Sequence, residues 1–413
     1  MYQASILFAI PFFLVAILLE WWALYRQNKQ QGYRFNDAIT NLNIGIGQQA
    51  TGMFLKSVML YGYVWLYEHA SLWHIPNTWW SFVLCLVAFD FAFYWAHRLG
   101  HESNLFWGAH SVHHQSEDYN LSVALRQSWL HSFLSFFLFL PIAIVGFHPK
   151  IFTAAAGINI LYQFWIHTEA IGKLPAWIEA IWNTPSHHRV HHAVNRQYID
   201  RNHAGMFIVW DKWFGTFEAE NEQPIYGITT PLRSWNPFWA NIHYYIELWQ
   251  QSRRYSRLRD RIYMWFAPPG WQPAEYGGYQ APPDIQPDSR PKYDTSTSVL
   301  FNLYVFAQFL LLIVGLIAFM SYFSDISAFY RVLFLSIILL SMQICGAIFE
   351  NRRWAKFAEF ARLLLVAISL NTFYYYWYQS WLGVMLISSA IAYLGFNIWF
   401  GIACQTINPK LSH

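Results

Sequence analysis

Apolar runs about as long as a membrane-spanning helix recur along this chain, and they limit its fold more than any other feature. A helix needs roughly 20 apolar residues to cross a hydrocarbon core of about 30 Å. Only 12% of the residues are charged, against about 25% in soluble domains. The sequence therefore predicts an all-α, polytopic membrane protein. The runs cover residues 6–25, 39–66, 79–95, 128–147, 151–171, 299–323, 329–349, 360–377 and 382–400.

The basic residues predict the orientation of these helices. The first run has no basic segment before it and no cleavage site after it, so we interpret it as a retained helix. Basic loops favour the cytoplasm, and one arrangement places every strong basic loop there together with the histidine-rich segments. It has an outside N-terminus, about nine helices and a cytoplasmic C-terminus. The expected location is the endoplasmic reticulum membrane in a eukaryote or the inner membrane in a bacterium.

Four regions follow from the changes in composition along the chain. The residues after 195 contain an arginine run and then a segment rich in proline and glycine, with no apolar run long enough to span. We expect a membrane-proximal cap and an irregular linker there. The expected regions are N-terminal membrane helices (1–78), a histidine-rich catalytic domain (79–235), the basic segment and linker (236–298) and a C-terminal four-helix membrane region (299–413).

Histidines gather in short clusters within one window of the chain, from His97 to His192. Twelve of the 17 histidines lie in this window, and eight of them form one pair spaced i,i+4 and two triplets spaced i,i+3,i+4. On a helix these spacings place imidazoles on one face. If the helices at 128–147 and 151–171 form a hairpin, all clusters reach the same side of the membrane. The predicted metal ligands are His97, His101, His110, His113, His114, His167, His188, His191 and His192.

Nine imidazoles are too many for one zinc ion with three protein ligands and an open position, so two metal ions fit better. His187 lies about 100° round a helix from its cluster and is left out of the set. The motifs of zinc proteases are absent, since position 105 is Leu105. The three cysteines are far apart, which argues against a disulfide framework or a cysteine zinc site. A net charge of +3 is too small to indicate nucleic acid as a partner.

The three clusters resemble the HxxxH, HxxHH and HxxHH boxes of the fatty acid hydroxylase superfamily, which includes sterol desaturases. Longer stretches strengthen this resemblance and place the chain near the branch that acts on alkylglycerols, over about residues 85–235. The stretches are Asp90–Arg98, Ser116–Ser122, Ala124–Ser128, Tyr162–Glu169, Asn183–His192 and Trp210–Glu220.

This resemblance implies a non-haem centre of two iron ions and a monooxygenase that uses tetrahydrobiopterin and O2. The implied substrate is an alkylglycerol or a lyso ether lipid, hydroxylated at its ether-bearing carbon to give a fatty aldehyde and a glycerol derivative. No residue is assigned to the pterin. Two alternatives stay open: another sterol desaturase-like lipid hydroxylase that takes electrons from a protein donor, and a metal-dependent transporter or sensor. The transporter would need several buried charges at the membrane midplane, and the sequence has few.

Four polar residues near the clusters are candidates to support the metal ligands or to bind the pterin amine: Asp90, Glu102, Asp118 and Asn195. Asp90 lies seven residues before His97, two helical turns along the same face. It could accept the second ring N–H of a ligand histidine. The alternative is a carboxylate that only pairs helices.

Overall fold

The computed structural model describes residues 2–29, 32–286, 290–295, 297–378 and 382–405, and its regular secondary structure in this part of the chain is helical. Its described residues form no extended strand, only two isolated bridges, between Trp182 and Phe207 and between Ala193 and Tyr226. The predicted all-helical class is confirmed. The chain divides into two compact units, residues 1–233 with 239–293 and residues 234–238 with 294–413.

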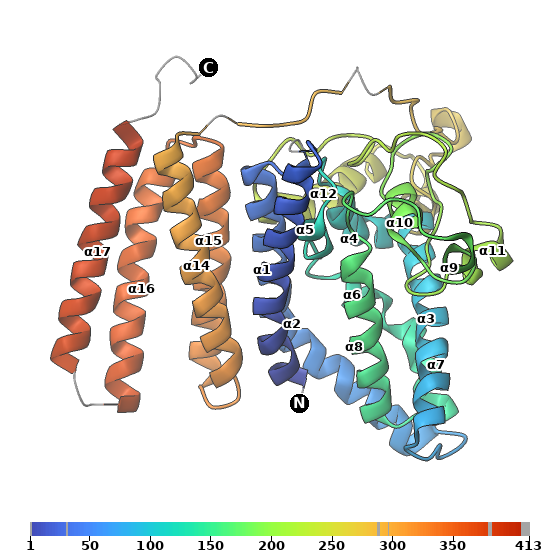
Figure 1. Cartoon of the computed structure of the whole chain (residues 1–413), viewed down its shortest axis with the longest axis horizontal. Helices are drawn as coiled ribbons and strands as arrows, with labels where there is room; N and C mark the ends of the chain where they lie inside the picture. Colours follow the sequence, from blue (N-terminus) through green and yellow to red (C-terminus); the bar gives the residue numbers. More distant parts are fainter. Residues whose placement is uncertain (1, 30–31, 287–289, 296, 379–381, 406–413) are drawn as a thin grey trace. The chain divides into compact units, whose positions relative to one another are not determined.

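The first unit contains long helices at its start and short ones around the histidine clusters (Figure 1). Its helices are α1 (Tyr2–Arg26), α2 (Phe35–Ala70), α3 (Trp79–Glu102), α4 (Asn104–His114), α5 (Leu121–Ala124), α6 (His131–Ser135), η2 (Phe136–Phe139), α7 (Leu140–Val145), α8 (Pro149–Trp165), α9 (Ala176–Glu179), α10 (Pro185–His191), α11 (Val209–Phe214), α12 (Pro237–Ser252), α13 (Leu258–Phe266) and η3 (Ala274–Tyr276). The first two residues of α12 are grouped with the second unit.

The second unit is a bundle of four helices, α14 (Val299–Tyr322), α15 (Ala328–Phe349), α16 (Ala355–Tyr378) and α17 (Leu382–Gln405). Consecutive helices pack on one another, and α17 also packs on α14. The bundle encloses a buried ion pair, because Arg362 donates to Glu359 at 2.6 Å and to Gln308 at 2.7 Å. A buried charge inside a membrane bundle is costly unless it is paired in this way.

Five helices within the described residues are long and apolar enough to cross a membrane: α3, α14, α15, α16 and α17. The first predicted span forms the continuous helix α1, and the weak second run forms the 36-residue helix α2. The prediction of several spanning helices is therefore confirmed. The count of nine and the cytoplasmic side remain predictions.

The run at 128–147 differs from the single helix that we expected. It forms three short pieces, α6, η2 and α7. Pro141 has no backbone N–H to continue the hydrogen bonding of a preceding turn. Gly146 then ends α7 with a φ of +106°, and a Cβ there would lie 1.7 Å from the carbonyl oxygen of Trp73. The segment therefore turns where a longer helix would continue.

The packing of α3 on α8 fixes the frame of the first unit. Phe89 of α3 contacts Phe152 of α8, with ring centroids 5.5 Å apart. Tyr63 of α2 stacks on the same Phe152 at 4.1 Å and donates a hydrogen bond to the carbonyl of Phe147 at 2.9 Å. Ala92 and other small residues belong to this core and let the helix backbones approach closely. The frame holds the ends of α3 and α8 together, where the histidines begin.

Candidate metal centre

The nine predicted ligand histidines form two buried sets. The first set has five members and the second has four, and within each set one ligand nitrogen per residue lies within 4.8 Å of all the others. The five-histidine set is His97, His101, His110, His114 and His191, and the four-histidine set is His113, His167, His188 and His192. The structure therefore brings together all nine residues that the sequence singled out.

Four helix ends deliver these side chains to one place. His97 and His101 lie in the last two turns of α3, and the second cluster ends α4. His167 lies two residues beyond the end of α8. The third cluster is on α10, which begins with Pro185 at its first position, where a missing backbone N–H costs nothing. The i,i+3,i+4 spacing then turns the rings of each short helix toward the same interior.

The outward ring nitrogens of several ligands donate to main-chain carbonyls, and this fixes their tautomer. His113 Nδ1 lies 3.1 Å from the carbonyl oxygen of Arg126, and His167 Nδ1 lies 2.7 Å from that of Gln163. A carbonyl can only accept, so each Nδ1 carries the proton and each Nε2 of the neutral ring presents a lone pair. These two Nε2 atoms lie 3.2 Å apart. Two facing lone pairs at this distance repel each other, and a metal ion bound by both would relieve that repulsion.

Other nitrogens in the sets support the same interpretation. The Nε2 atoms of His101, His191 and His192 are buried and have no hydrogen-bond partner within the described structure. Burial lowers the pKa of His114, His191 and His192 well below the ordinary imidazole value, and neighbouring histidines lower it further. The rings are thus held in the neutral form that binds metals.

The dimensions of the sets also fit metal ions. Imidazole nitrogens bind at about 2.0–2.1 Å, so two ligands of one ion lie at most about 4.2 Å apart. The limit of 4.8 Å within each set needs only a small contraction. The sets adjoin, because the rings of His114 and His192 stack at 4.3 Å and His113 directly precedes His114. The residues present fit two neighbouring metal ions.

One loop, Asp200–His203, supports three of the five ligands in the first set. His97 Nδ1 lies 2.7 Å from the carbonyl oxygen of His203, and His191 Nδ1 lies 2.9 Å from that of Arg201. His101 Nδ1 lies 3.3 Å from Oδ1 of Asp200. Acceptors of this kind orient a ligand ring and raise its basicity. We call this segment the support loop.

The support loop is held in a conformation that few residues adopt. Asp200 and Asn202 both have a φ of +56°, a region that aspartate and asparagine tolerate better than other side chains. Asn202 Nδ2 donates to the carbonyls of His187 at 3.0 Å and Glu218 at 2.8 Å. Asp211 accepts from the backbone N–H of His203 at 2.7 Å. The loop is therefore fixed by side chains from outside the histidine clusters, and the sequence analysis missed it.

Asp200 offers a direct test of the support loop, because its side chain is half exposed and its removal leaves the core intact. We expect Asp200→Gly to weaken metal binding at the five-histidine set by roughly 10- to 100-fold, since His101 loses its acceptor. Asp200→Asn keeps both the acceptor and the left-handed backbone, so it should retain binding. The measurement is metal retained per chain during a chelator titration. Equal retention in the glycine and parent proteins would contradict this role.

Asp90 is fully buried, and its two oxygens accept from groups other than histidine rings. Oδ1 accepts from the backbone N–H of Met206 at 2.7 Å and from Asn159 at 2.6 Å. Oδ2 accepts from Trp210 Nε1 at 2.8 Å and from the backbone N–H of Phe207 at 3.0 Å. The carboxylate thus joins α3, α8 and the segment before α11.

Asp90 reaches the four-histidine set only through intermediates. Asn159 accepts from Gln163 at 2.6 Å, and the Gln163 carbonyl accepts from His167. Gly205 makes the close approach possible, because a Cβ there would lie 2.6 Å from Oδ1 of Asp90. In place of the direct bond to a ligand ring that we considered for Asp90, the structure has this series of hydrogen bonds through Asn159 and Gln163.

Two other polar candidates have hydrogen-bond partners other than histidine rings. Glu102 pairs with Arg98 at 2.8 Å, and its side chain is about half exposed. Asn195 bridges two loops, donating to the carbonyl of Gln223 at 3.0 Å and accepting from the backbone N–H of Ile225 at 2.8 Å. In the described structure, the contacts of Glu102 and Asn195 therefore join parts of the fold to one another.

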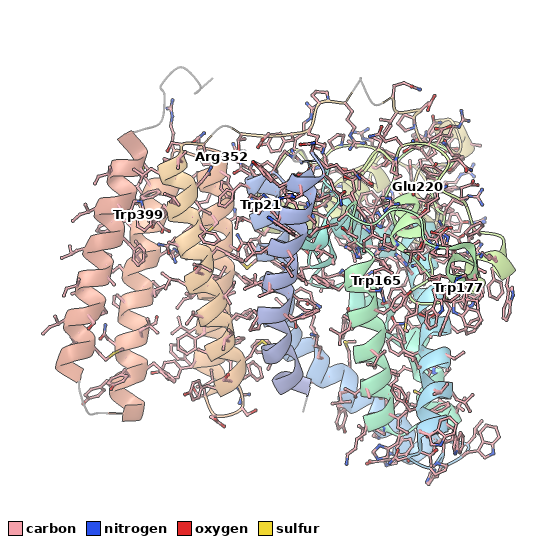
Figure 2. The ribbon with its side chains drawn as sticks, viewed as in Figure 1. Trp21, Trp165, Trp177, Glu220, Arg352 and Trp399 are labelled. Atoms are coloured by element: carbon pink, nitrogen blue, oxygen red, sulfur yellow. The ribbon has the colours of Figure 1, made fainter. Side chains whose placement is uncertain are left out.

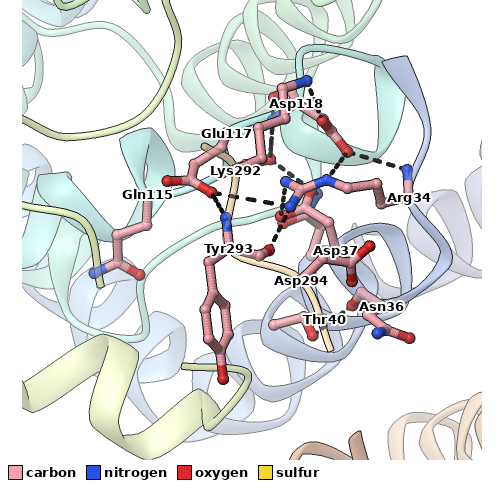
Figure 3. Close-up of polar contacts among 12 residues, drawn as sticks. Arg34, Asn36, Asp37, Thr40, Gln115, Glu117, Asp118, Lys292, Tyr293 and Asp294 are labelled. Atoms are coloured by element: carbon pink, nitrogen blue, oxygen red, sulfur yellow. Dashed lines mark hydrogen bonds and ion pairs between the residues drawn. The ribbon is translucent and has the colours of Figure 1, made fainter. Parts of the chain in front are cut away.

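Asp118 belongs to an ionic network beside the second cluster (Figure 3). It accepts from Arg34 Nε at 3.0 Å and from Lys292 Nζ at 2.6 Å. Glu117 next to it accepts from the backbone N–H of Tyr293 at 2.6 Å. The network ties the loop after α4 to the start of α2 and to the segment that ends the first unit.

Arg189 and three further histidines belong to neither set. Arg189, on the same helix as His188 and His191, forms a two-point pair with Glu220, labelled in Figure 2, at 2.7 Å for each bond. His187 contacts Phe217. His131 and His203 pack on the five-histidine set, at 4.7 Å from the His110 ring and 5.0 Å from the His101 ring. Neither of these two has cluster spacing, so no sequence signal marks them.

Comparisons with known proteins agree with this geometry. The family model described as fatty acid hydroxylase matches residues 82–216, which hold all nine histidines. The alkylglycerol monooxygenase of Homo sapiens is 37% identical over 86% of this chain and 80% of its own length. The alkylglycerol monooxygenases of Xenopus tropicalis and Danio rerio are 35% and 34% identical over similar shares. No solved structure matches the chain. With this identity over most of both sequences, the chain belongs to the alkylglycerol monooxygenase family.

Proposed function

We propose that this protein is a membrane di-iron monooxygenase that hydroxylates the ether-bearing carbon of alkylglycerols or lyso ether lipids. The observation that carries the proposal is the pair of adjoining, buried, all-histidine sets in a chain of the alkylglycerol monooxygenase family. Tetrahydrobiopterin would supply electrons and O2 the inserted oxygen atom. The hydroxylated ether carbon is a hemiacetal, which collapses to a fatty aldehyde and a glycerol derivative.

The chemistry of the ligands supports iron. Neutral imidazole binds iron, zinc, copper and nickel. Oxidation of an unactivated C–H bond is beyond acid and base catalysis, and a redox metal supplies the oxidant. Because the reaction attributed to the family is such an oxidation, iron explains the site better than zinc does. His97, His101, His110, His114 and His191 would hold one ion, and His113, His167, His188 and His192 the other.

The protein's own residues would prepare the site in three ways. The carbonyls of Arg126, Gln163 and the support loop keep Nδ1 protonated, so that Nε2 is free for the metal. Burial of all nine rings excludes water from the centre. The ends of α3 and α8 hold the sets at the edge of the expected membrane, on the cytoplasmic side in our orientation, where a lipid's ether carbon can reach them.

The choice of electron donor separates this proposal from its nearest alternative. We expect purified, iron-loaded protein to form fatty aldehyde from an alkylglycerol when tetrahydrobiopterin is the only reductant. Product formation with a cytochrome or a ferredoxin, and none with the pterin, would indicate another lipid hydroxylase of the fatty acid hydroxylase superfamily. Mass spectrometry of the lipid products makes the distinction, and heat-treated protein is the control.

A further inference from the structure

The short helix α13 (Leu258–Phe266) is fixed to the point where α3 ends. The backbone N–H of Asn104, two residues beyond α3, donates to the carbonyl of Ala267 at 2.9 Å. Its side chain donates to the carbonyl of Met264 at 2.8 Å. Because α3 is a candidate spanning helix, these bonds place the end of α13 at the level where a span leaves the membrane. At about 1.5 Å per residue, α13 is too short to cross a bilayer itself.

One face of α13 is buried and the opposite face is apolar but exposed. Met264 packs in a core with Leu248 and Tyr255. Leu258, Ile262 and Phe266 follow one another at intervals of four and are 69%, 55% and 59% exposed. This spacing places them in a single stripe along the helix. We call these three residues the apolar stripe.

Arginines lie on both sides of the apolar stripe. With about 100° between successive residues, Arg259 falls on one side of the stripe and Arg261 falls on the other, and Arg257 directly precedes the helix. All three side chains belong to exposed residues. Arginine can lay its methylene stem along apolar surface while its guanidinium stays in the polar headgroup layer.

We propose that α13 lies in the membrane interface, with the apolar stripe among the lipid chains and its arginines on anionic headgroups. Three observations support it: attachment to the end of a span, an exposed apolar stripe, and positive charges flanking that stripe. An amphipathic helix of this kind buries its apolar face about 5–10 Å into the boundary between headgroups and acyl chains. Contact with a second protein would explain why the stripe is apolar. It would not explain why α13 is attached at the end of α3, where a span leaves the membrane. The inference does not depend on the reaction catalysed.

The depth of α13 can be measured in the full chain reconstituted into vesicles. Cys85 and Cys345 are buried and Cys404 is partly exposed, so the background variant is Cys404→Ser. A fluorophore is attached at Ile262→Cys, with Leu258→Cys as a second position and the exposed Asp284→Cys as the control. Because these side chains lie on the surface, the substitutions leave the core unchanged.

We expect nitroxide groups on the lipid chains to quench the labels at 262 and 258 several-fold more than the label at 284. Iodide in the water should show the reverse order. Quenching of all three labels by iodide alone would overturn the proposal. Shielding of the stripe from both quenchers would indicate a protein contact and would also overturn it.

Vesicle composition tests the ionic part of the proposal. Each arginine near an anionic membrane surface strengthens binding to that surface by a factor of roughly five. Quenching at Ile262→Cys should therefore rise when phosphatidylserine is added to phosphatidylcholine vesicles, and the rise should disappear in the Arg257→Gln, Arg259→Gln, Arg261→Gln variant. The same depth with and without phosphatidylserine would contradict a role for anionic lipid.

Discussion

Replacing His191 by alanine is expected to abolish turnover and to release metal from the five-histidine set. Its Nε2 is buried without a partner in the described structure, and its Nδ1 is already held by the support loop. Alanine removes one of the five imidazoles that form the set. His101→Ala should give the same result, because His101 Nε2 is also buried and has no hydrogen-bond partner in the described structure. Metal per chain and aldehyde formation are the two measurements.

His74→Ala is the matched control for these variants. His74 is exposed and belongs to neither set, so metal content and turnover should stay at the level of the parent.

His188→Ala should deplete the four-histidine set in the same way as His191→Ala depletes the five-histidine set. Recovery of every variant in the membrane fraction shows that the protein still inserts. Full activity in both His101→Ala and His191→Ala would mean that the clusters are structural.

Asp90→Asn is expected to lower the stability of the first unit by roughly 2–4 kcal/mol, although the side chain keeps its size. One oxygen becomes an NH2 group that faces donors, so either the pair from Met206 and Asn159 or the pair from Phe207 and Trp210 loses its acceptor. The thermal unfolding midpoint of the purified protein should fall clearly.

Trp210→Phe provides a graded comparison for Asp90→Asn. It removes a single bond to the same carboxylate and should cost about 1.5–3 kcal/mol, because a hydrogen bond to a charged group is worth roughly that much. An unchanged midpoint in Asp90→Asn would show that the carboxylate does not hold α3, α8 and the segment before α11 together. Equal losses in the two variants would show that only the tryptophan bond matters.

The candidate ligand histidines could be predicted from the sequence because helical spacing is a local property. The intervals within each cluster place rings on one face whatever the rest of the fold does. His167 was also found, since it lies near the end of the second apolar run of the predicted hairpin. The division into five and four was not predictable, because it depends on how α3, α4 and α10 meet in space.

The groups that support the ligands escaped prediction for a related reason. The carbonyls of Arg126, Gln163, Arg201 and His203 carry no signature, since every residue has a carbonyl group. Asp90 was selected for its distance from His97 along one helix, yet its partners come from residues about 70 and 120 positions away. Sequence spacing finds contacts within a helix and misses contacts between segments.

Apolar runs predicted helices well where nothing interrupted them. The four C-terminal runs became α14 to α17. In the run at 128–147, Pro141 and Gly146 lie at the start and the end of α7 and limit its length, and such local effects are lost when hydropathy is averaged over about twenty residues.

Counting metal on the purified protein while assaying its lipid product tests the central claim most directly. The two histidine sets predict two iron ions per chain, together with fatty aldehyde formed from an alkylglycerol in the presence of tetrahydrobiopterin and O2. Fewer than one iron per chain and no aldehyde under these conditions would contradict a di-iron ether-lipid monooxygenase.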